Sequence, residues 1–327
     1  MILIISQETE VSTEDVIEWL LFNKASWKRI NGEKTIQSVA LEFGGGCLGK
    51  QAHWWNADGE TSFSEIHAVW YRRGDLNIQS TQLNEEYEGM QQINAYHRKE
   101  TLAFRLALHQ ALSDKYCIGS IFENYLSKIS ILEKAIAAGF SVPATLITTS
   151  KKELLKFLTQ TGAQVVTKSI DHVLSFWIQS SNYYAHTSLI DQEALNLMPP
   201  AFNATLFQER IPKKYELRVF YLDQAVFCAA IFSQHDPRTQ IDFRNYNYER
   251  PNRVTPYRLP DTITAQITGL MRKMEMRSGS LDLIVTPNDE YIFLEVNPVG
   301  QFKQVSDPCN YYIEKKIADT LTHADRT

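Results

Sequence analysis

The sequence predicts a mixed α/β protein built from three modules in a row. Near the N-terminus, short apolar strands alternate with amphipathic helices. A second unit of helices and strands begins near Tyr116, and the remainder of the chain is rich in strands with one helix among them. Such alternation is typical of layered domains in which helices cover the faces of sheets. We therefore expect modules over residues 1–115, 116–200 and 201–327.

The first module opens with an apolar strand, Leu3–Ser6. A helix is predicted next, because the polar run Ser12–Asp15 has the composition of a helix cap and the apolar residues after it follow helical spacing. Ala68–Tyr71 is apolar and indicates a second strand, and residues 84–112 have the periodicity of a long helix.

The second and third modules are assigned in the same way. Helices are predicted at Leu126–Ala138, Lys152–Thr159 and Asp261–Met276. Gly139 and Gly162 follow the first two helices, where glycine commonly ends a helix. Strands are predicted at Thr145–Thr148, Ala163–Ser169, Ala204–Glu209, Glu216–Leu222, Ala225–Phe232, Leu281–Thr286 and Tyr291–Val296.

Composition and charge exclude several classes of protein. The 327 residues carry 33 Lys and Arg against 38 Asp and Glu, a net charge of −5, which argues against a dedicated nucleic-acid binder. No apolar run approaches the roughly 18 residues of a membrane span. The N-terminal apolar segment Met1–Ile5 is too short for a signal peptide, and the four cysteines form no Cys-x-x-Cys pair. We expect a cytoplasmic protein that binds neither nucleic acid nor membrane.

The strongest chemical signal lies in the last two predicted strands. With a four-residue loop between Thr286 and Tyr291, antiparallel pairing sets Asp282 opposite Glu295 and leaves Asn297 on the same face. Two facing carboxylates among apolar residues repel each other, and a divalent cation removes that conflict. Oxygen ligands of this kind are those that Mg²⁺ prefers. The alternative is a surface hairpin whose polar residues face water.

Candidates for binding phosphate are weaker. Gly44–Lys50 fits the Gly-x-x-x-x-Gly-Lys template, but Gln51 stands where Ser or Thr is required and no helix follows, so a glycine-rich turn is the better interpretation. Lys168 ends an apolar strand and Lys128 opens a helix. Each lysine taken alone is equally compatible with an ordinary surface position.

A strand that runs into an extended linker offers backbone groups to a flat ligand such as adenine. Its residues are Gln208, Glu209, Arg210 and Ile211. Beyond it, Glu216 and Arg218 alternate onto one face of the next strand. Arg218 there can clamp a phosphoryl group, or it can form a cross-strand ion pair.

Taken in order, these residues resemble the ATP-grasp fold between about Phe122 and Asp307. Within it, the chain is most similar to the peptide maturases of the graspetide or microviridin type, including the grasp-with-spasm branch. The overall length, the strand end Val69–Arg73 and the Glu-Val-Asn-Pro sequence from Glu295 favour this branch. The resemblance implies an N-terminal α/β pre-ATP-grasp domain followed by two ATP-grasp subdomains.

The resemblance also implies roles for single residues. Lys128 and Lys168 would hold the phosphates of ATP, and Glu216 its ribose. The adenine would meet the linker of Gln208, Glu209, Arg210 and Ile211, chiefly through backbone groups of Glu209 and Ile211. Mg²⁺ would be held by Asp282, Glu295 and Asn297. Arg218 and Lys168 would serve catalysis, Arg218 by stabilising an acyl-phosphate. One departure is that Ser169–Ile178 contains no glycine, whereas many ATP-grasp enzymes have a glycine-rich flap there.

The implied partner is a ribosomally made precursor peptide with a leader and a core rich in Thr, Asp, Glu and Lys. The enzyme would activate its carboxylates with ATP and form ester or amide crosslinks, and it would work as a homodimer. Candidate peptide-binding residues are Arg72, Arg73, Arg244 and Arg253. The last two belong to a basic and aromatic stretch that is also compatible with a solvated loop.

Two other functions stay open. One is another ATP-grasp carboxylate–amine ligase, such as an enzyme that adds amino acids to the tail of a protein. The other is a catalytically silent ATP-grasp scaffold that only binds a peptide.

Overall fold

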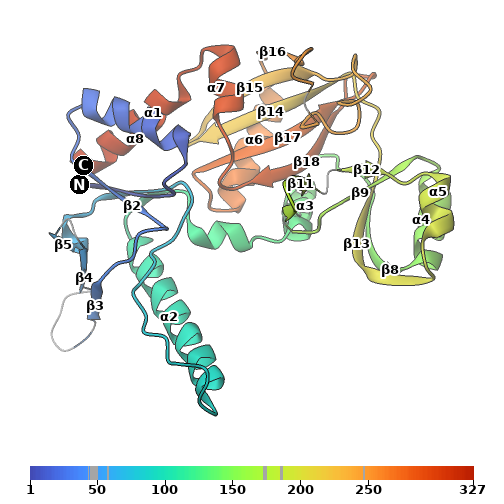
Figure 1. The fold of residues 1–327 in the computed structure, drawn as a ribbon. Coiled ribbons are helices and arrows are strands. Elements are labelled where there is room, and N and C mark those ends of the chain that lie inside the picture. The colour runs from blue at the N-terminus through green and yellow to red at the C-terminus, as the bar shows by residue number, and fades with distance from the viewer. Residues whose placement is uncertain (43, 45–50, 57–58, 172–174, 185–186, 246) are drawn as a thin grey trace. The chain divides into compact units, whose positions relative to one another are not determined.

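A computed structural model gives the fold of residues 1–42, 44, 51–56, 59–171, 175–184, 187–245 and 247–327. Most of the glycine-rich motif from Gly44 to Lys50 therefore lies outside the described residues. The chain divides into two compact units, which are described separately (Figure 1). Unit 1 comprises Met1–Tyr125, Met276–Ser278 and Tyr312–Thr327, and unit 2 comprises Leu126–Glu275 and Gly279–Tyr311. The predicted three-module boundaries stay a prediction.

Four parallel strands form the main sheet of unit 1, in the order β2-β1-β6-β7. Their bounds are Ile2–Ser6 for β1, Trp27–Asn31 for β2, Ala68–Tyr71 for β6 and Tyr116–Ile118 for β7. Strands β1 and β6 are buried along their whole length, which explains why their sequences are continuous apolar runs. Helices α1 (Val11–Phe22) and α8 (Ile313–Arg326) pack against each other, and α8 also lies against β1 and β6.

Helix α1 begins earlier than predicted. The polar run Ser12–Asp15 was expected to cap the helix, but the helix starts at Val11 and its N-cap residue is Glu10. The run lies within the first turn instead. There the hydroxyl groups of Thr13 and Ser6 share a hydrogen bond of 2.7 Å, which satisfies a buried polar side chain at the end of β1. The predicted cap was therefore wrong.

The rest of unit 1 contains a smaller antiparallel sheet and a long helix. The sheet consists of β3 (Ser38–Glu42), β4 (Gln51–Asn56) and β5 (Gly59–Ser62), and two 3₁₀ helices cover Phe63–Glu65 and Ile121–Tyr125. Helix α2 spans Met90–Leu112, so it begins six residues after the predicted position 84. Gly89, with a φ of 83°, precedes it. The Asn94 side chain bonds both the N–H and the carbonyl of Leu83, at 3.0 and 2.9 Å, and folds the preceding segment back onto the helix.

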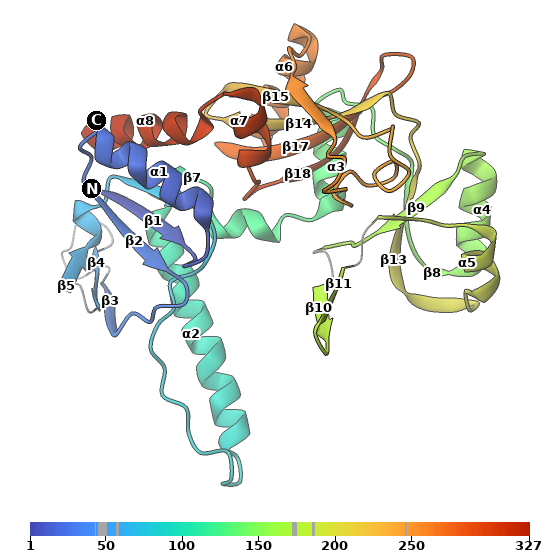
Figure 2. The same cartoon turned by 45° about the horizontal axis from the view of Figure 1, so that its top comes forward.

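Unit 2 contains a first antiparallel sheet in the order β12-β9-β13-β8. Its strands are β8 (Thr145–Ser150), β9 (Val165–Lys168), β12 (Ser188–Leu189) and β13 (Ala201–Glu209). Helices α4 (Lys151–Thr161) and α5 (Gln192–Leu197) accompany it, with Leu154, Val165 and Phe207 in the core. Helix α4 stops at Gly162, as predicted, and this residue has the left-handed conformation. A hairpin of β10 (Ser175–Ile178) and β11 (Ser181–Tyr184) stands apart from the sheets (Figure 2).

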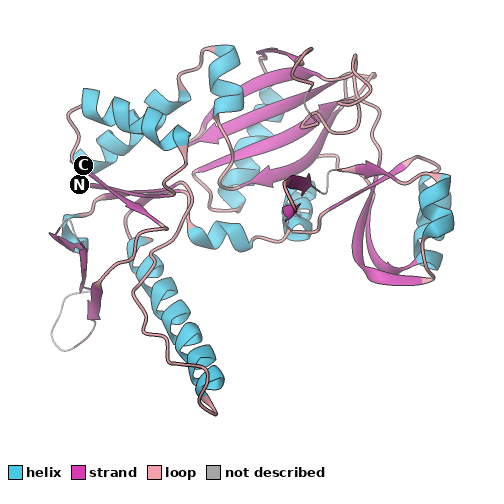
Figure 3. Ribbon diagram, viewed as in Figure 1, coloured by secondary structure: helices cyan, strands magenta, loops and turns pink. Residues whose placement is uncertain are grey.

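The second sheet of unit 2 has five strands in the order β16-β15-β14-β17-β18 (Figure 3). These are β14 (Tyr215–Leu222), β15 (Ala225–Phe232), β16 (Arg253–Pro256), β17 (Ser278–Val285) and β18 (Tyr291–Asn297). The helices of this part are α3 (Lys128–Ala137), α6 (Asp261–Lys273) and α7 (Lys303–Cys309). Helix α3 packs against β18 and α6, and α7 packs against β14, β15 and β16. This sheet carries the residues that the sequence singled out for metal binding.

The hairpin of β17 and β18 has a β-bulge that changes its register. At the turn, Val285 lies opposite Tyr291, so the predicted pairing of Thr286 with Tyr291 was wrong. The register then shifts between Asp282 and Leu283. Leu294 is the extra residue of β18, and beyond it Asp282 lies opposite Glu295, as predicted.

Candidate functional site

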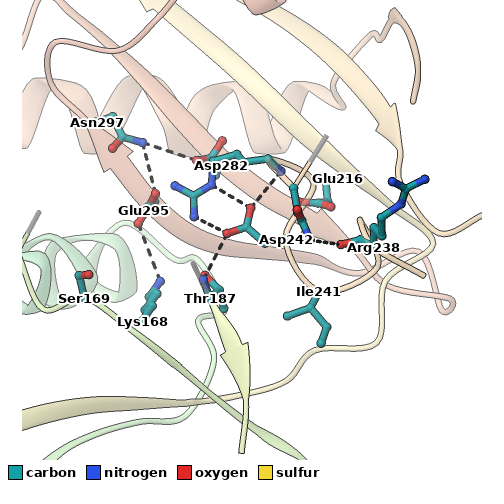
Figure 4. Close-up of polar contacts among 12 residues, drawn as sticks. Lys168, Ser169, Thr187, Glu216, Arg238, Ile241, Asp242, Asp282, Glu295 and Asn297 are labelled. Carbon is teal, nitrogen blue, oxygen red and sulfur yellow. Dashed lines mark hydrogen bonds and ion pairs between the residues drawn. The ribbon is translucent and has the colours of Figure 1, made fainter. Parts of the chain in front are cut away.

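Asp282, Glu295 and Asn297 converge at the bulged end of the β17–β18 hairpin (Figure 4). The Asn297 amide nitrogen lies 3.5 Å from Asp282 Oδ2 and 3.4 Å from Glu295 Oε1. The two carboxylates belong to adjacent strands and face each other, while Asn297 is two residues along from Glu295 on the same face. The structure thus brings together the three residues predicted to bind a metal.

Each of these carboxylates faces a cation. Arg218 Nη1 lies 2.6 Å from both carboxylate oxygens of Asp282, across the neighbouring strands β14 and β17. Lys168 Nζ lies 3.8 Å from Glu295 Oε2. Burial raises the pKa of Asp282, although Arg218 acts in the opposite direction. Burial also acts to raise the pKa of Glu295, but the cations Lys168 and Lys128 outweigh it and the pKa is lowered.

Lys128 belongs to the same electrostatic group. It is the first residue of α3, and its ammonium donates to the carbonyl of Ser169, 2.9 Å away, directly after the strand of Lys168. Burial lowers the pKa of Lys128, and the negative charge of Glu295 opposes that shift. The two lysines singled out in the sequence therefore lie at one end of the same site, on α3 and β9.

The linker predicted to meet adenine is held by its neighbours. The N–H groups of Glu209 and Arg210 donate to the carbonyls of Ala144 and Gln164, at 2.9 and 2.7 Å. The side chain of Arg210 also bonds that of Gln164. Gln208 is buried, and its amide donates to the Thr145 hydroxyl at 3.0 Å. These contacts fix the path of the chain from β13 toward Ile211 and β14.

Glu216 is buried and its carboxylate is bound on one side. Glu216 Oε1 accepts hydrogen bonds from Lys213 Nζ at 2.6 Å and from Ser233 Oγ at 2.7 Å. Burial raises the pKa of Glu216, and the ammonium of Lys213 opposes that shift. The sequence analysis did not identify Lys213 or Ser233. Glu216 and Arg218 both reach the site from alternate positions of β14, as their spacing predicts.

Many of these residues line one cavity of unit 2, which has a volume of about 740 Å³ and opens to solvent. Lys128, Arg218 and Asn297 do not line it. Its walls come from β9, β13, the linker after β13, the loop after β15 and the β17–β18 hairpin. The lining residues named in the sequence analysis are Lys168, Gln208, Glu209, Arg210, Ile211, Glu216, Arg244, Asp282 and Glu295. Pockets of about this size accommodate ligands as large as a nucleotide.

A second acid–base pair lines the cavity. Asp242 accepts two hydrogen bonds from the Arg244 guanidinium, from Nε at 2.8 Å and from Nη2 at 2.7 Å. Its carboxylate also accepts one from the backbone N–H of Thr187, at 3.4 Å. The hydrogen bonds that Arg244 donates to Asp242 raise the pKa of Arg244, and the charges of Glu295 and Asp282 add to that effect. The sequence identified Arg244 but not Asp242.

The other predicted peptide-binding arginines lie elsewhere. Arg253 is an exposed residue of β16, with its guanidinium 5.3 Å from the centre of the Phe232 ring. Arg72 and Arg73 belong to unit 1, and both pair with Glu10, at 3.3 and 3.2 Å. Arg72 is buried there, an environment typical of a structural ion pair. Binding of peptide by these three residues stays a prediction.

The donor set at Asp282, Glu295 and Asn297 fits a hard divalent cation, since two carboxylates and an amide oxygen are ligands that Mg²⁺ prefers. Asn297 now directs its amide nitrogen at both carboxylates, and rotation of that amide by half a turn presents its oxygen instead. No three His, Cys, Asp or Glu side chains converge in the described ranges, so substrate phosphate and water would complete the coordination.

One buried polar atom of the site has no partner. Among the described residues, the buried Nε of Arg218 has no hydrogen-bond partner. A buried donor without a partner costs free energy, so natural proteins leave few of them.

The fold of the chain is similar to that of a solved ATP-grasp ligase and of solved macrocyclases. One is a RiPP-associated ATP-grasp ligase from Chryseobacterium gregarium in complex with ADP and a leader and core peptide, with a TM-score of 0.82 and 26% identity over 98% of this chain and 96% of that one. Another is the macrocyclase MdnC from Microcystis aeruginosa MRC bound with precursor peptide MdnA, with a TM-score of 0.78 and 27% identity over 99% of this chain and 100% of that one. Macrocyclase MdnB of the same organism has a TM-score of 0.71 and 21% identity, over 98% of this chain and 98% of that one.

These similarities span nearly the whole length of the chain, which therefore has the ATP-grasp fold predicted from its motifs. No protein-family model matches the sequence, and no curated protein matches it. Within the described residues, no helix is long and apolar enough to cross a membrane.

Proposed function

We propose that this ATP-grasp chain is a peptide maturase. It activates Asp or Glu side chains of a ribosomally made precursor peptide with ATP and joins them to Thr or Ser hydroxyl groups, or to Lys amines, as macrocyclic crosslinks. The observation that carries the proposal is the cavity lined by the carboxylates of Asp282 and Glu295 together with Lys168 and Arg244. Arg218 pairs with Asp282 from the neighbouring strand. The chain's similarity to ligases solved with ADP and with precursor peptides supports the same function.

ATP lies along the cavity, with its adenine at the linker and its phosphates at the lysines. Because the N–H of Glu209 is already bonded to Ala144, the carbonyl of Glu209 and the N–H of Ile211 are the backbone groups that pair with the adenine edge. Lys128 and Lys168 neutralise the phosphates.

Asp282, Glu295 and Asn297 would hold Mg²⁺. When bound, the ion would supply positive charge that offsets the negative charge of the phosphates. Arg218 and Lys168 pair with these two carboxylates and offset their negative charge.

Two steps then form one crosslink. A carboxylate oxygen of the peptide attacks the γ-phosphorus, the bond from that phosphorus to the bridging oxygen of ADP breaks, and ADP leaves an acyl-phosphate behind. Next, a hydroxyl or amine of the peptide attacks the acyl carbon, loses its proton, and displaces phosphate. The positive charges of the Arg218 and Arg244 guanidinium groups stabilise the anionic oxygens of these steps. The peptide loses one water for each crosslink.

The proposal is tested with a small Thr-, Asp-, Glu- and Lys-rich precursor encoded beside the gene. Incubation with the enzyme, ATP and Mg²⁺ should lower the mass of the precursor by one water per crosslink and release an equal number of ADP molecules. Esters and amides are then separated by mild alkaline hydrolysis, which opens only esters. ADP release without a change in peptide mass would contradict the proposal.

The two alternatives give different results in that experiment. A ligase that adds amino acids to a protein tail raises the mass of its substrate. A silent scaffold binds the peptide and releases no ADP. The cation and carboxylate set of Lys168, Arg218, Asp282 and Glu295 is complete in this chain, which argues against a silent scaffold.

A further inference from the structure

We propose that Lys213 is a positioning residue which, together with Ser233, fixes the Glu216 carboxylate so that the site binds ribonucleotides in preference to 2′-deoxyribonucleotides. The inference rests on the proposed function, because it requires a nucleotide in the cavity. It concerns the sugar rather than the phosphates, and it assigns a role to two residues that are not part of the sequence motifs.

The geometry of the Glu216 carboxylate is asymmetric. Oε1 accepts from the Lys213 ammonium at 2.6 Å and from the Ser233 hydroxyl at 2.7 Å (Figure 4 shows Glu216). Ser233 is fully buried and Glu216 is 7% exposed. No group in the described part of the chain donates to Oε2 of Glu216, a residue that lines the cavity. One oxygen is therefore anchored in the protein and the other is left for a ligand.

Lys213 holds this arrangement from one side. Its side chain is 6% exposed, and its ammonium also donates to the carbonyl of Ile241 at 3.2 Å. A buried ammonium with two partners stays in one orientation, and its charge opposes the effect of burial on the pKa of the neighbouring carboxyl group. Without Lys213, burial favours the neutral carboxyl of Glu216, and a single bond from Ser233 leaves that group free to turn.

The position of Glu216 in the cavity suggests which ligand group it meets. It lines the same cavity as Ile211, at the end of the linker, and as the carboxylate of Asp282. In the proposed nucleotide pose, the linker holds the adenine and Asp282 lies at the phosphate end. The sugar then lies next to Glu216. An ionised carboxylate accepts hydrogen bonds only, and the ribose hydroxyl groups are the donors of that region.

The expected preference follows from the strength of such a bond. A hydrogen bond to a charged acceptor that is lost without replacement weakens binding by about 10- to 100-fold. We therefore expect the intact chain to bind ATP about 10- to 100-fold more tightly than 2′-deoxy-ATP. Without the anchor, the ratio should fall to about threefold or less, because a turned or neutral carboxyl bonds both sugars poorly.

Calorimetric titration of the full-length protein with ATP and with 2′-deoxy-ATP, both with Mg²⁺, tests the inference. The variants are Lys213→Met, Lys213→Arg, Ser233→Ala and, as the matched control, Lys214→Met. Lys214 is adjacent, but its side chain is 49% exposed and pairs with Asp289, away from the cavity. Lys214→Met should keep the ratio of dissociation constants of the unchanged protein, Lys213→Arg should keep most of it, and Lys213→Met and Ser233→Ala should lower it.

Each result bears on the inference in its own way. Equal binding of both nucleotides by the unchanged protein, or a Lys213→Met variant that keeps the full ratio, would overturn it while leaving ATP binding intact. If the unchanged protein binds neither nucleotide, the proposed function itself fails and the inference with it. If Lys213→Met does not fold, as judged by circular dichroism, Ser233→Ala and Lys213→Arg decide in its place.

Discussion

Replacement of Asp242 by Asn is expected to weaken the use of the peptide substrate without changing the affinity for ATP. Asp242 holds Arg244 through two hydrogen bonds of 2.8 and 2.7 Å, and Arg244 lies within electrostatic reach of Asp282 and Glu295. In the variant, one carboxylate oxygen becomes an amide nitrogen that faces the guanidinium. The bidentate pair is then reduced to one hydrogen bond without the carboxylate charge.

The size of the effect can be estimated from that loss. A hydrogen bond between charged groups contributes about 1.5–3 kcal/mol, and about 1.4 kcal/mol corresponds to a factor of ten. If the held orientation of Arg244 is needed for reaction, kcat/KM for the peptide should fall by about 10- to 100-fold. ADP release measured with a coupled assay at saturating ATP gives this value, and calorimetry gives the affinity for ATP.

Asp236→Asn is the matched control, because it makes the same chemical change in the same loop. Asp236 bonds Asn247 and the N–H of Arg238 and does not line the cavity. It should keep kcat/KM within about twofold of the unchanged enzyme. Equal losses of kcat/KM in the two variants would refute the reasoning. So would an Asp242→Asn variant that binds ATP more weakly but keeps its peptide kinetics.

Three other changes test the metal site, the packing and the pH dependence. Glu295→Ala should lower peptide-dependent ADP release by roughly 100-fold or more, and turnover close to normal would contradict the metal assignment. Gly300→Ala should lower the melting temperature markedly, because the added Cβ would lie 2.1 Å from Oγ and 2.5 Å from the backbone nitrogen of Ser280. The control is Gly269→Ala, in open space on α6, which should be neutral or stabilising by up to about 1 kcal/mol. Burial raises the pKa of Glu123 to about 8 from 4.5, and a raised acid pKa contributes stability that is lost as pH rises through this range. Glu123→Gln should therefore melt at a higher temperature than the unchanged protein at pH 8, with the difference shrinking toward pH 5, and parallel melting curves against pH would exclude this role.

Much of the site was predictable because strands have a period of two. Asp282, Glu295 and Asn297 are correctly placed by counting along a hairpin. The count nevertheless succeeded through two compensating differences. The turn is one residue longer than predicted, and the bulge at Leu294 restores the register before the carboxylates are reached.

Lys213 shows where that periodicity ends. In an extended chain, Lys214 and Glu216 would share a face, and Lys213 would point the other way. Strand β14 begins only at Tyr215, however, so the residues before it do not continue the alternation. Lys213 turns inward to Glu216, and Lys214 turns outward to Asp289.

Asp242 was not predictable for a related reason. It lies in the irregular segment between β15 and β16, where no repeat of apolar residues fixes the direction of a side chain. Its position depends on its contacts with Arg244 and with the Thr187 N–H, and Thr187 lies more than 50 residues earlier in the chain. The misplaced start of α1 has the same origin, because the hydroxyl of Thr13 bonds Ser6 of a neighbouring strand rather than the end of its own helix.

The bulge in β18 has a practical consequence for protein engineering. Asp282 pairs with Glu295 on the side of the Leu294 bulge that lies away from the turn. This pairing therefore does not depend on how many residues the turn contains. The turn residues 287–290 are exposed, and the Thr286 hydroxyl accepts the N–H groups of Asn288 and Glu290 at its base. Natural length variation would be tolerated at this tip, and an affinity tag or a fluorophore can be inserted there while the two carboxylates keep their register.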